Sequence, residues 1–271
     1  MRGVALNSDW TEAMTKNSAK KRAARDYQAA HPGTTFPAAL RAIESPATAA
    51  DYIAAPASAE TEHFTEPRRL ADNRLREQRA QRARSSKQVA PINALVDKIG
   101  VEQSVTNMPL IDPTFGGINA TVLFVLKAPE ADANPNLSGP RLLSLDNDDD
   151  TAQDMFRLTA ETGLDRSSIT AWNVCPFPAE GKNPTAAEVK RSARYHSELF
   201  SLLPHLQVIV LFGDDAKRHW KHVPYPGSAR VLDCHLPSRW NRPGKDGVPR
   251  DRDSWVGIQS TLAEAAKLVD G

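Results

Sequence analysis

Four residues of this chain have side chains suited to acid/base or electrostatic chemistry: Asp148, Asp149, Asn173 and His235. A carboxylate can position a water molecule, and an imidazole can donate or accept a proton near neutral pH. An amide presents both a donor and an acceptor to a bound group. The sequence lacks Walker A and GxGxxG phosphate loops, the GxSxG nucleophile elbow and the ligand spacing of a metal site. Chemistry by Asn, Asp and His remains, and we expect no metal ion and no cofactor.

Short runs with the composition of β-strands precede these residues or the turns near them. The runs are Thr121 to Leu126, Ser168 to Ala171, Gln207 to Phe212 and Ala229 to Leu232. Helical patterns separate them, and strands that alternate with helices predict a parallel α/β sheet. Parallel sheets bind ligands at the carboxyl ends of their strands. We therefore predict an α/β three-layer sandwich with a central, mainly parallel four-stranded sheet, whose polar residues gather at one edge.

The chain divides by composition into three predicted parts. Residues 1–44 have the pattern of a helical hairpin, which is either structural or a DNA-binding helix-turn-helix. Residues 45–90 begin as a linker rich in Ala, Pro, Ser and Thr and continue as a basic helix. Residues 91–271 carry the strands, and we predict helices there at Ile92 to Ile99, Asp154 to Thr162, Ala186 to Leu203, Asp214 to Trp220 and Ser254 to Val269.

Basic residues outnumber acidic ones between Glu66 and Lys87, although the net charge of the whole chain is only +1. Such a segment suits a polyanionic partner, with Arg79 and Arg82 as candidates to contact phosphates. The alternative is a charged helix that is merely solvated.

Composition also indicates a class of protein and a compartment. No apolar run reaches the length of a membrane span, and the N-terminus is too polar for a secretory signal. Cys175 and Cys234 are too few for a disulfide scaffold or for the ligands of an iron-sulfur cluster, so we expect reduced thiols. The sequence predicts a cytoplasmic protein with no membrane partner, acting as a monomer.

Four short motifs, in their order along the chain, resemble those of the uracil-DNA glycosylase superfamily. The resemblance covers roughly Ile92 to Val269. The motifs are Leu126-Lys127-Ala128-Pro129-Glu130, Thr170-Ala171-Trp172-Asn173-Val174-Cys175-Pro176, Val208-Ile209-Val210-Leu211-Phe212-Gly213 and His235-Leu236-Pro237-Ser238. The run Asp146-Asn147-Asp148-Asp149-Asp150-Thr151-Ala152 is similar to the acidic segment of an actinobacterial-type branch without iron-sulfur cysteines.

The resemblance implies a DNA glycosylase that flips out uracil or a modified pyrimidine and hydrolyses its N-glycosidic bond. Asp148 or Asp149 would position water, or else simply occupy a helix N-terminus. Asn173 would read the base edge, or cap a turn, and His235 would donate to the base carbonyl, or be a satisfied loop histidine. The remaining candidates are Lys127, Ala128, Pro129 and Ser238 for the substrate, and Arg239, Trp240 and Arg242 as a wedge into DNA, with packing of Trp240 as the alternative.

Three departures from the superfamily pattern bear on the substrate. Lys127 stands where iron-sulfur members carry Glu, and Leu236 separates His235 from Pro237. The segment 138–143 offers no aromatic residue to stack on a base. The sequence therefore leaves open a repair enzyme for uracil, a defence enzyme for hypermodified phage bases, and an inactive DNA-binding protein with this fold.

Overall fold

The computed structural model of the chain describes residue 25 and residues 66–130, 139–244 and 247–269. The predicted hairpin, apart from Arg25, and the first part of the predicted linker lie outside these residues. From residue 66 onward, the described residues belong to one compact unit, Phe64–Gly271. No described helix is both long enough and apolar enough to cross a membrane.

Four parallel strands form the central sheet in the order β4-β2-β5-β6. They are β2 (Val122–Leu126), β4 (Ile169–Asn173), β5 (Val208–Phe212) and β6 (Arg230–Cys234). Both β2 and β5 are apolar throughout and almost wholly buried, as expected for parallel strands covered on both faces. The predicted four-stranded sheet is confirmed, with β4 and β6 each ending two residues later than predicted.

The strands of this sheet end in register. Asn173 is paired with Leu126 across β4 and β2, and Phe212 is paired with Cys234 across β5 and β6. Because Val125 is paired with Leu211, the pairs Leu126–Asn173 and Phe212–Cys234 lie in one row across the sheet. The residues that follow the four strands therefore start from the same edge.

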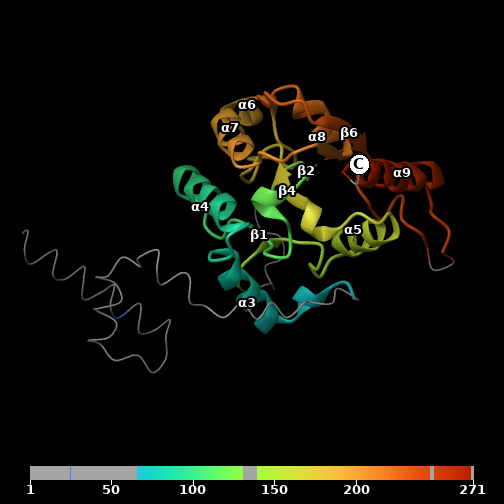
Figure 1. The fold of residues 1–271 in the computed structure, drawn as a ribbon, viewed down its shortest axis with the longest axis horizontal. Coiled ribbons are helices and arrows are strands. Elements are labelled where there is room, and N and C mark those ends of the chain that lie inside the picture. Colours follow the sequence, from blue (N-terminus) through green and yellow to red (C-terminus); the bar gives the residue numbers. More distant parts are fainter. Residues whose placement is uncertain (1–24, 26–65, 131–138, 245–246, 270–271) are drawn as a thin grey trace, which may run out of the picture. The chain divides into compact units, whose positions relative to one another are not determined.

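Helices cover both faces of the sheet, as predicted (Figure 1). On one face lie α5 (Asp150–Glu161) and α9 (Arg252–Val269), which pack on each other. On the other lie α4 (Ala90–Gln103), α6 (Ala186–Arg191), α7 (Ala193–Ser201) and α8 (Gly213–Trp220). The rings of Phe200 in α7 and Trp220 in α8 are 6.4 Å apart, which places these two helices side by side.

All five predicted helices differ somewhat from the observed bounds, and two of these differences have local reasons. The predicted helix from Ala186 to Leu203 is divided at Ser192, whose hydroxyl donates to the Val189 carbonyl at 2.7 Å and competes with the backbone ladder. The helix predicted from Asp154 begins at Asp150, because the Asp149 carboxylate accepts from the Ala152 N–H at 2.8 Å and caps the first turn.

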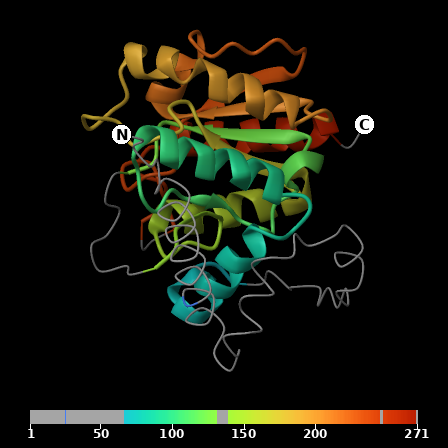
Figure 2. The same ribbon diagram turned by 90° about the vertical axis from the view of Figure 1, so that its left-hand side faces the viewer.

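The basic segment forms α3 (Asn73–Ala83), which lies at the lower end of the unit in Figures 1 and 2. It packs against β1 (Leu110–Ile111), which pairs with β3 (Leu142–Leu143) in a separate two-stranded sheet. The compact unit therefore begins before the boundary predicted at residue 91, and α3 is part of it. The two short strands were not predicted, since two residues carry no periodicity.

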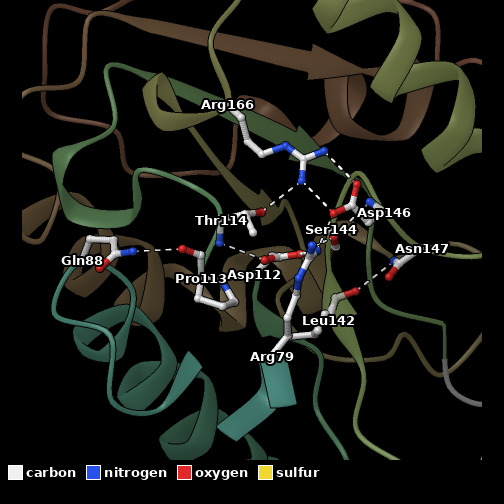
Figure 3. Close-up of polar contacts among 10 residues, drawn as sticks. All are labelled: Arg79, Gln88, Asp112, Pro113, Thr114, Leu142, Ser144, Asp146, Asn147 and Arg166. Atoms are coloured by element: carbon white, nitrogen blue, oxygen red, sulfur yellow. Dashed lines mark hydrogen bonds and ion pairs between the residues drawn. The ribbon is translucent and has the colours of Figure 1, made fainter. Parts of the chain in front are cut away.

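A buried cluster of charges joins α3 to the rest of the unit (Figure 3). The Arg79 guanidinium contacts Asp112 Oδ2 at 3.0 Å and pairs with Asp146, and all three side chains have no exposed surface. From the other side, Arg166 donates to both carboxylate oxygens of Asp146 at 2.8 Å and to Thr114 Oγ1 at 3.2 Å. Two cations thus balance two carboxylates in the interior.

This cluster corrects the prediction for Arg79, which has no surface with which to contact a phosphate. Burial alone would raise the pKa of Asp146, but the hydrogen bonds and charge of Arg166, together with those of Arg79, hold that pKa below its ordinary value. The carboxylate therefore stays ionised and keeps both arginines in place. By contrast, Arg82 lies on the exposed face of α3, so its predicted contact with phosphate stays a prediction.

Arg79→Met should lower the free energy of unfolding by about 3–5 kcal/mol, because it leaves buried carboxylates short of a counter-charge. The matched control is Arg82→Met on the exposed face of the same helix, which should cost less than about 1 kcal/mol. Urea denaturation measures both. Equal losses in the two variants would contradict the structural role of Arg79.

Candidate functional site

The carboxyl edge of the central sheet is the candidate site. The connection after β2 leads to α5 on one face, while β5 passes directly into α8 on the other face. Parallel sheets bind ligands at such a reversal, outside the carboxyl ends of the strands. Asn173 on β4 and Cys234 on β6 lie three strand spacings apart in the same row, about 14 Å at ~4.8 Å per strand.

Asn173 ends β4 and is only 4% exposed. Among the described residues its side-chain amide has no hydrogen-bond partner. The backbone after it is fixed, because the N–H of Val174 donates to Leu126 O at 2.7 Å and that of Cys175 to Lys127 O at 2.9 Å. The amide atoms of Asn173 are not among the fully buried polar atoms that lack a partner, so its donor and acceptor reach solvent and are available to a ligand.

His196, a buried residue of α7, contacts the backbone just after the end of β4. Its Nε2 lies 3.0 Å from the Val174 carbonyl and 3.1 Å from Ser192 Oγ. Because a carbonyl only accepts, Nε2 carries the proton. Burial lowers the pKa of His196 to about 4, so the ring is neutral at physiological pH. Sequence reasoning missed this role, since the contact with Val174 joins residues that are distant along the chain.

The loop after β2 turns toward the loop after β4. Lys127 Nζ lies 3.4 Å from the Lys182 carbonyl and 3.3 Å from Asn183 Oδ1. Pro129 is buried, and Ala128 packs on the core. Lys127 therefore contacts the loop at 182–183, and the substrate contacts predicted for these three residues stay predictions.

The two aspartates predicted to position water have different surroundings at the N-terminus of α5. Asp149 caps the helix, which is the simpler of its two predicted roles. Asp148 has a side chain that is 45% exposed and pairs with Arg68 at 3.1 Å. The next residue after the cap, Asp150, pairs with both Arg68 and Arg242.

The loop after β6 is held against the start of α5. Thr151 Oγ1 donates to the Pro237 carbonyl at 3.2 Å, which brings the loop of His235 to the acidic helix start. His235 itself is exposed. Ser238 stabilises the turn in which it lies. Its N–H donates to Asn241 Oδ1 at 2.8 Å, and its hydroxyl accepts from the Trp240 N–H at 3.3 Å.

The three residues predicted to enter DNA divide into two groups. Trp240 is 67% exposed, and the guanidinium of Arg239 lies 4.6 Å from the centre of its ring. The Trp240 ring is therefore not packed into the domain, which was the alternative prediction. Arg242 instead lies against α5, where it pairs with Asp150 and places its Nε 3.0 Å from Asp154 Oδ2. Arg242 would have to leave these carboxylates to contact a phosphate.

Both cysteines are buried free thiols, and burial raises the pKa of each to about 12. Neither is therefore a ready nucleophile at neutral pH. Within the ranges that the structure describes, no three His, Cys, Asp or Glu side chains gather to hold a metal ion.

The edge thus offers an unpartnered amide on β4 and, at its other end, an exposed imidazole on a loop that contacts the acidic start of α5 and carries the exposed Trp240. This arrangement can bind a polar planar group and assist proton transfer or water attack next to it. No protein-family model matches the chain, and no curated protein matches it either. Function is therefore inferred from these residues and their geometry.

His196 should make stability depend on pH between about 6.5 and 4. Its folded pKa is about 4 and its ordinary value is 6.5, so the unfolded chain takes up the proton first. The stabilisation is complete above pH 6.5 and is lost as the pH falls toward 4, by about 3 kcal/mol in total. Urea denaturation across this range should give a flatter pH dependence for His196→Gln than for the native chain. The same slope in both proteins would refute the assignment.

Proposed function

We propose that this protein is a DNA glycosylase that hydrolyses the N-glycosidic bond of a flipped-out uracil or modified pyrimidine and leaves an abasic site. We further propose that it acts on DNA as a cytoplasmic monomer without a metal ion. The observation that carries the proposal is the amide of Asn173, largely buried and without a partner at the ligand-binding edge of a parallel sheet. The order of the four strand-end motifs supports it.

Base release requires stabilisation of two developing charges. Negative charge gathers on the departing base, while the sugar gains oxocarbenium character. Asn173 meets the first need by donating to the base from a site of low exposure, where a fixed dipole acts strongly. Its carbonyl can accept from the same base edge, which selects a pyrimidine with a donor beside an acceptor. His196 keeps the backbone after Asn173 in position.

His235 and Asp148 take the roles on the opposite side of the ligand. His235 follows the last residue of β6, across the row from Asn173, and donates to the base carbonyl as charge develops. Asp148 positions the attacking water, a role that suits it better than Asp149, whose carboxylate is already used as a helix cap. In sequence, Asp148 lies three residues before Thr151 and His235 two residues before Pro237, and these two segments contact each other through the Thr151–Pro237 hydrogen bond.

The Arg239–Trp240 turn serves to open the duplex. Flipping a base costs a few kcal/mol, which proteins offset with side chains inserted between base steps and with phosphate contacts. Trp240 offers a large exposed ring for stacking, and Arg239 adds a cation on its face.

A second candidate is a DNA-binding protein that keeps the fold without the chemistry. Lys127 favours this inactive DNA-binding protein, because an ammonium group cannot act as a water-positioning base. The ammonium group of Lys127 instead contacts the loop at 182–183. An assay on two substrates separates these possibilities. The protein is incubated with oligonucleotides that contain uracil and, separately, with phage DNA that carries modified pyrimidines, and alkali then cleaves the strand at any abasic site. Cleavage at uracil indicates a repair enzyme, cleavage of phage DNA alone a defence enzyme, and binding without cleavage the inactive protein.

Asn173→Ala should reduce abasic-site formation by roughly 100-fold or more, because a donor aimed at developing charge is lost. Gln207→Ala, which removes an exposed amide at the opposite edge of the same sheet, is the matched control and should retain most of the activity. The unfolding midpoint of each variant checks that it is folded. A folded Asn173→Ala variant with full activity would remove Asn173 from the mechanism.

Trp240→Ala should slow base release from duplex DNA by roughly ten-fold or more and change release from single strands much less, since only the duplex must be unstacked. Val248→Ala, another exposed apolar residue close to this loop in sequence, should have little effect on either substrate. Single-turnover rates on the two DNA forms make the measurement. A uniform loss on both would argue against a wedge.

A further inference from the structure

Arg68 reaches the N-terminus of α5 from a segment that precedes α3. Its Nε donates to Gln153 Oε1 at 3.0 Å, its Nη1 donates to Asp148 Oδ1 at 3.1 Å, and its Nη2 pairs with Asp150. The backbone of Arg68 is left-handed, with φ 63° and ψ 21°, a conformation that is unfavourable for a residue other than glycine. Its contacts, rather than local backbone preference, therefore hold it in place.

The ion pair between Arg68 and Asp148 is open to competition. The Arg68 side chain is 32% exposed and that of Asp148 is 45% exposed. Ion pairs at this exposure are weak and are screened by salt. A guanidinium binds a phosphate as readily as it binds a carboxylate, and departure of Asp148 would free Nη1 of Arg68 to donate to a phosphate oxygen while Nε and Nη2 keep Gln153 and Asp150. A phosphate that reaches Arg68 can thus take the place of Asp148.

Arg68 also lies beside the surface that is proposed to meet DNA. Asp150 pairs with Arg68 on one side and with Arg242 on the other. Arg242 belongs to the same loop as the exposed Trp240. A DNA strand that packs on Trp240 would therefore bring its phosphates close to Arg68.

We propose that Arg68 is a phosphate-binding residue whose guanidinium is paired with Asp148 until DNA binds. A DNA phosphate displaces the Asp148 carboxylate from Arg68, and this exchange releases Asp148 to position the attacking water. The inference rests on the proposed glycosylase function. It makes the hydrolytic carboxylate available only when a nucleic acid backbone is bound.

A double-mutant cycle on DNA binding tests the exchange. The probe is a fluorescent duplex of ordinary bases, bound to the full chain carrying Arg68→Gln, Asp148→Asn or both, at several salt concentrations. Arg68→Gln should weaken binding roughly three-fold and reduce the salt slope by about one phosphate contact. Asp148→Asn should tighten binding roughly two- to five-fold, because it removes the competitor. In the double variant this tightening should disappear.

A matched background distinguishes exchange from a general effect of charge. Arg74 is an exposed arginine of α3, and in an Arg74→Gln background Asp148→Asn should still tighten binding. If Asp148→Asn tightens binding equally when Arg68 is absent, the effect is loss of a repelling charge and the exchange is refuted. Unchanged binding in folded Asp148→Asn refutes it as well.

Base release, measured separately with the native chain, keeps this inference distinct from the proposed function. Coupling between Arg68 and Asp148 without base release from any substrate would support the exchange and refute the glycosylase. Base release without coupling would support the glycosylase and refute the exchange. A folded chain that binds no DNA would refute both.

Discussion

The buried cluster of Arg79, Asp112, Asp146 and Arg166 is the interaction on which the remaining structure depends. Buried charges are tolerated only when they are paired, so each member requires the others. The cluster joins helix α3, the strand region around β1 and the segment before β4. Asp146 also lies two residues before Asp148, and the Leu70 N–H donates to its carbonyl at 2.9 Å. The position of the acidic edge residues is thus set from the interior.

Along the carboxyl edge, the residues proposed to contact a ligand differ from the residues that hold them in position. The residues that would meet a ligand are exposed or unpartnered, whereas their neighbours are fixed by contacts between distant segments. His196 fixes the backbone after Asn173, and Thr151 fixes the loop of His235. Placing such side chains at the ends of rigid strands gives them defined positions before any ligand arrives, which reduces the reorganisation that a reaction would require.

The sheet was predictable from sequence, because a short uninterrupted apolar run such as Val208–Phe212 is typical of a buried parallel strand. Asn173 and His235 were predicted to follow strands, and the structure places Asn173 as the last residue of β4 and His235 directly after β6. The role of Arg79 was not predictable, since a buried and a solvated arginine look alike along a helix, and its partners lie 33 and 67 residues away. The start of α5 was missed because three adjacent aspartates offer several possible caps. The ion pairs of Arg68 likewise join segments that no local pattern connects.

The outer strand of the sheet has a consequence for association with other chains. On β6 the side chains of Arg230, Val231 and Asp233 are exposed, while β5 beside it is wholly buried. A flat apolar edge strand can pair with a strand from another molecule. Charged side chains on an edge strand disfavour that pairing. The charged residues of β6 therefore disfavour aggregation of the protein through this edge of its sheet.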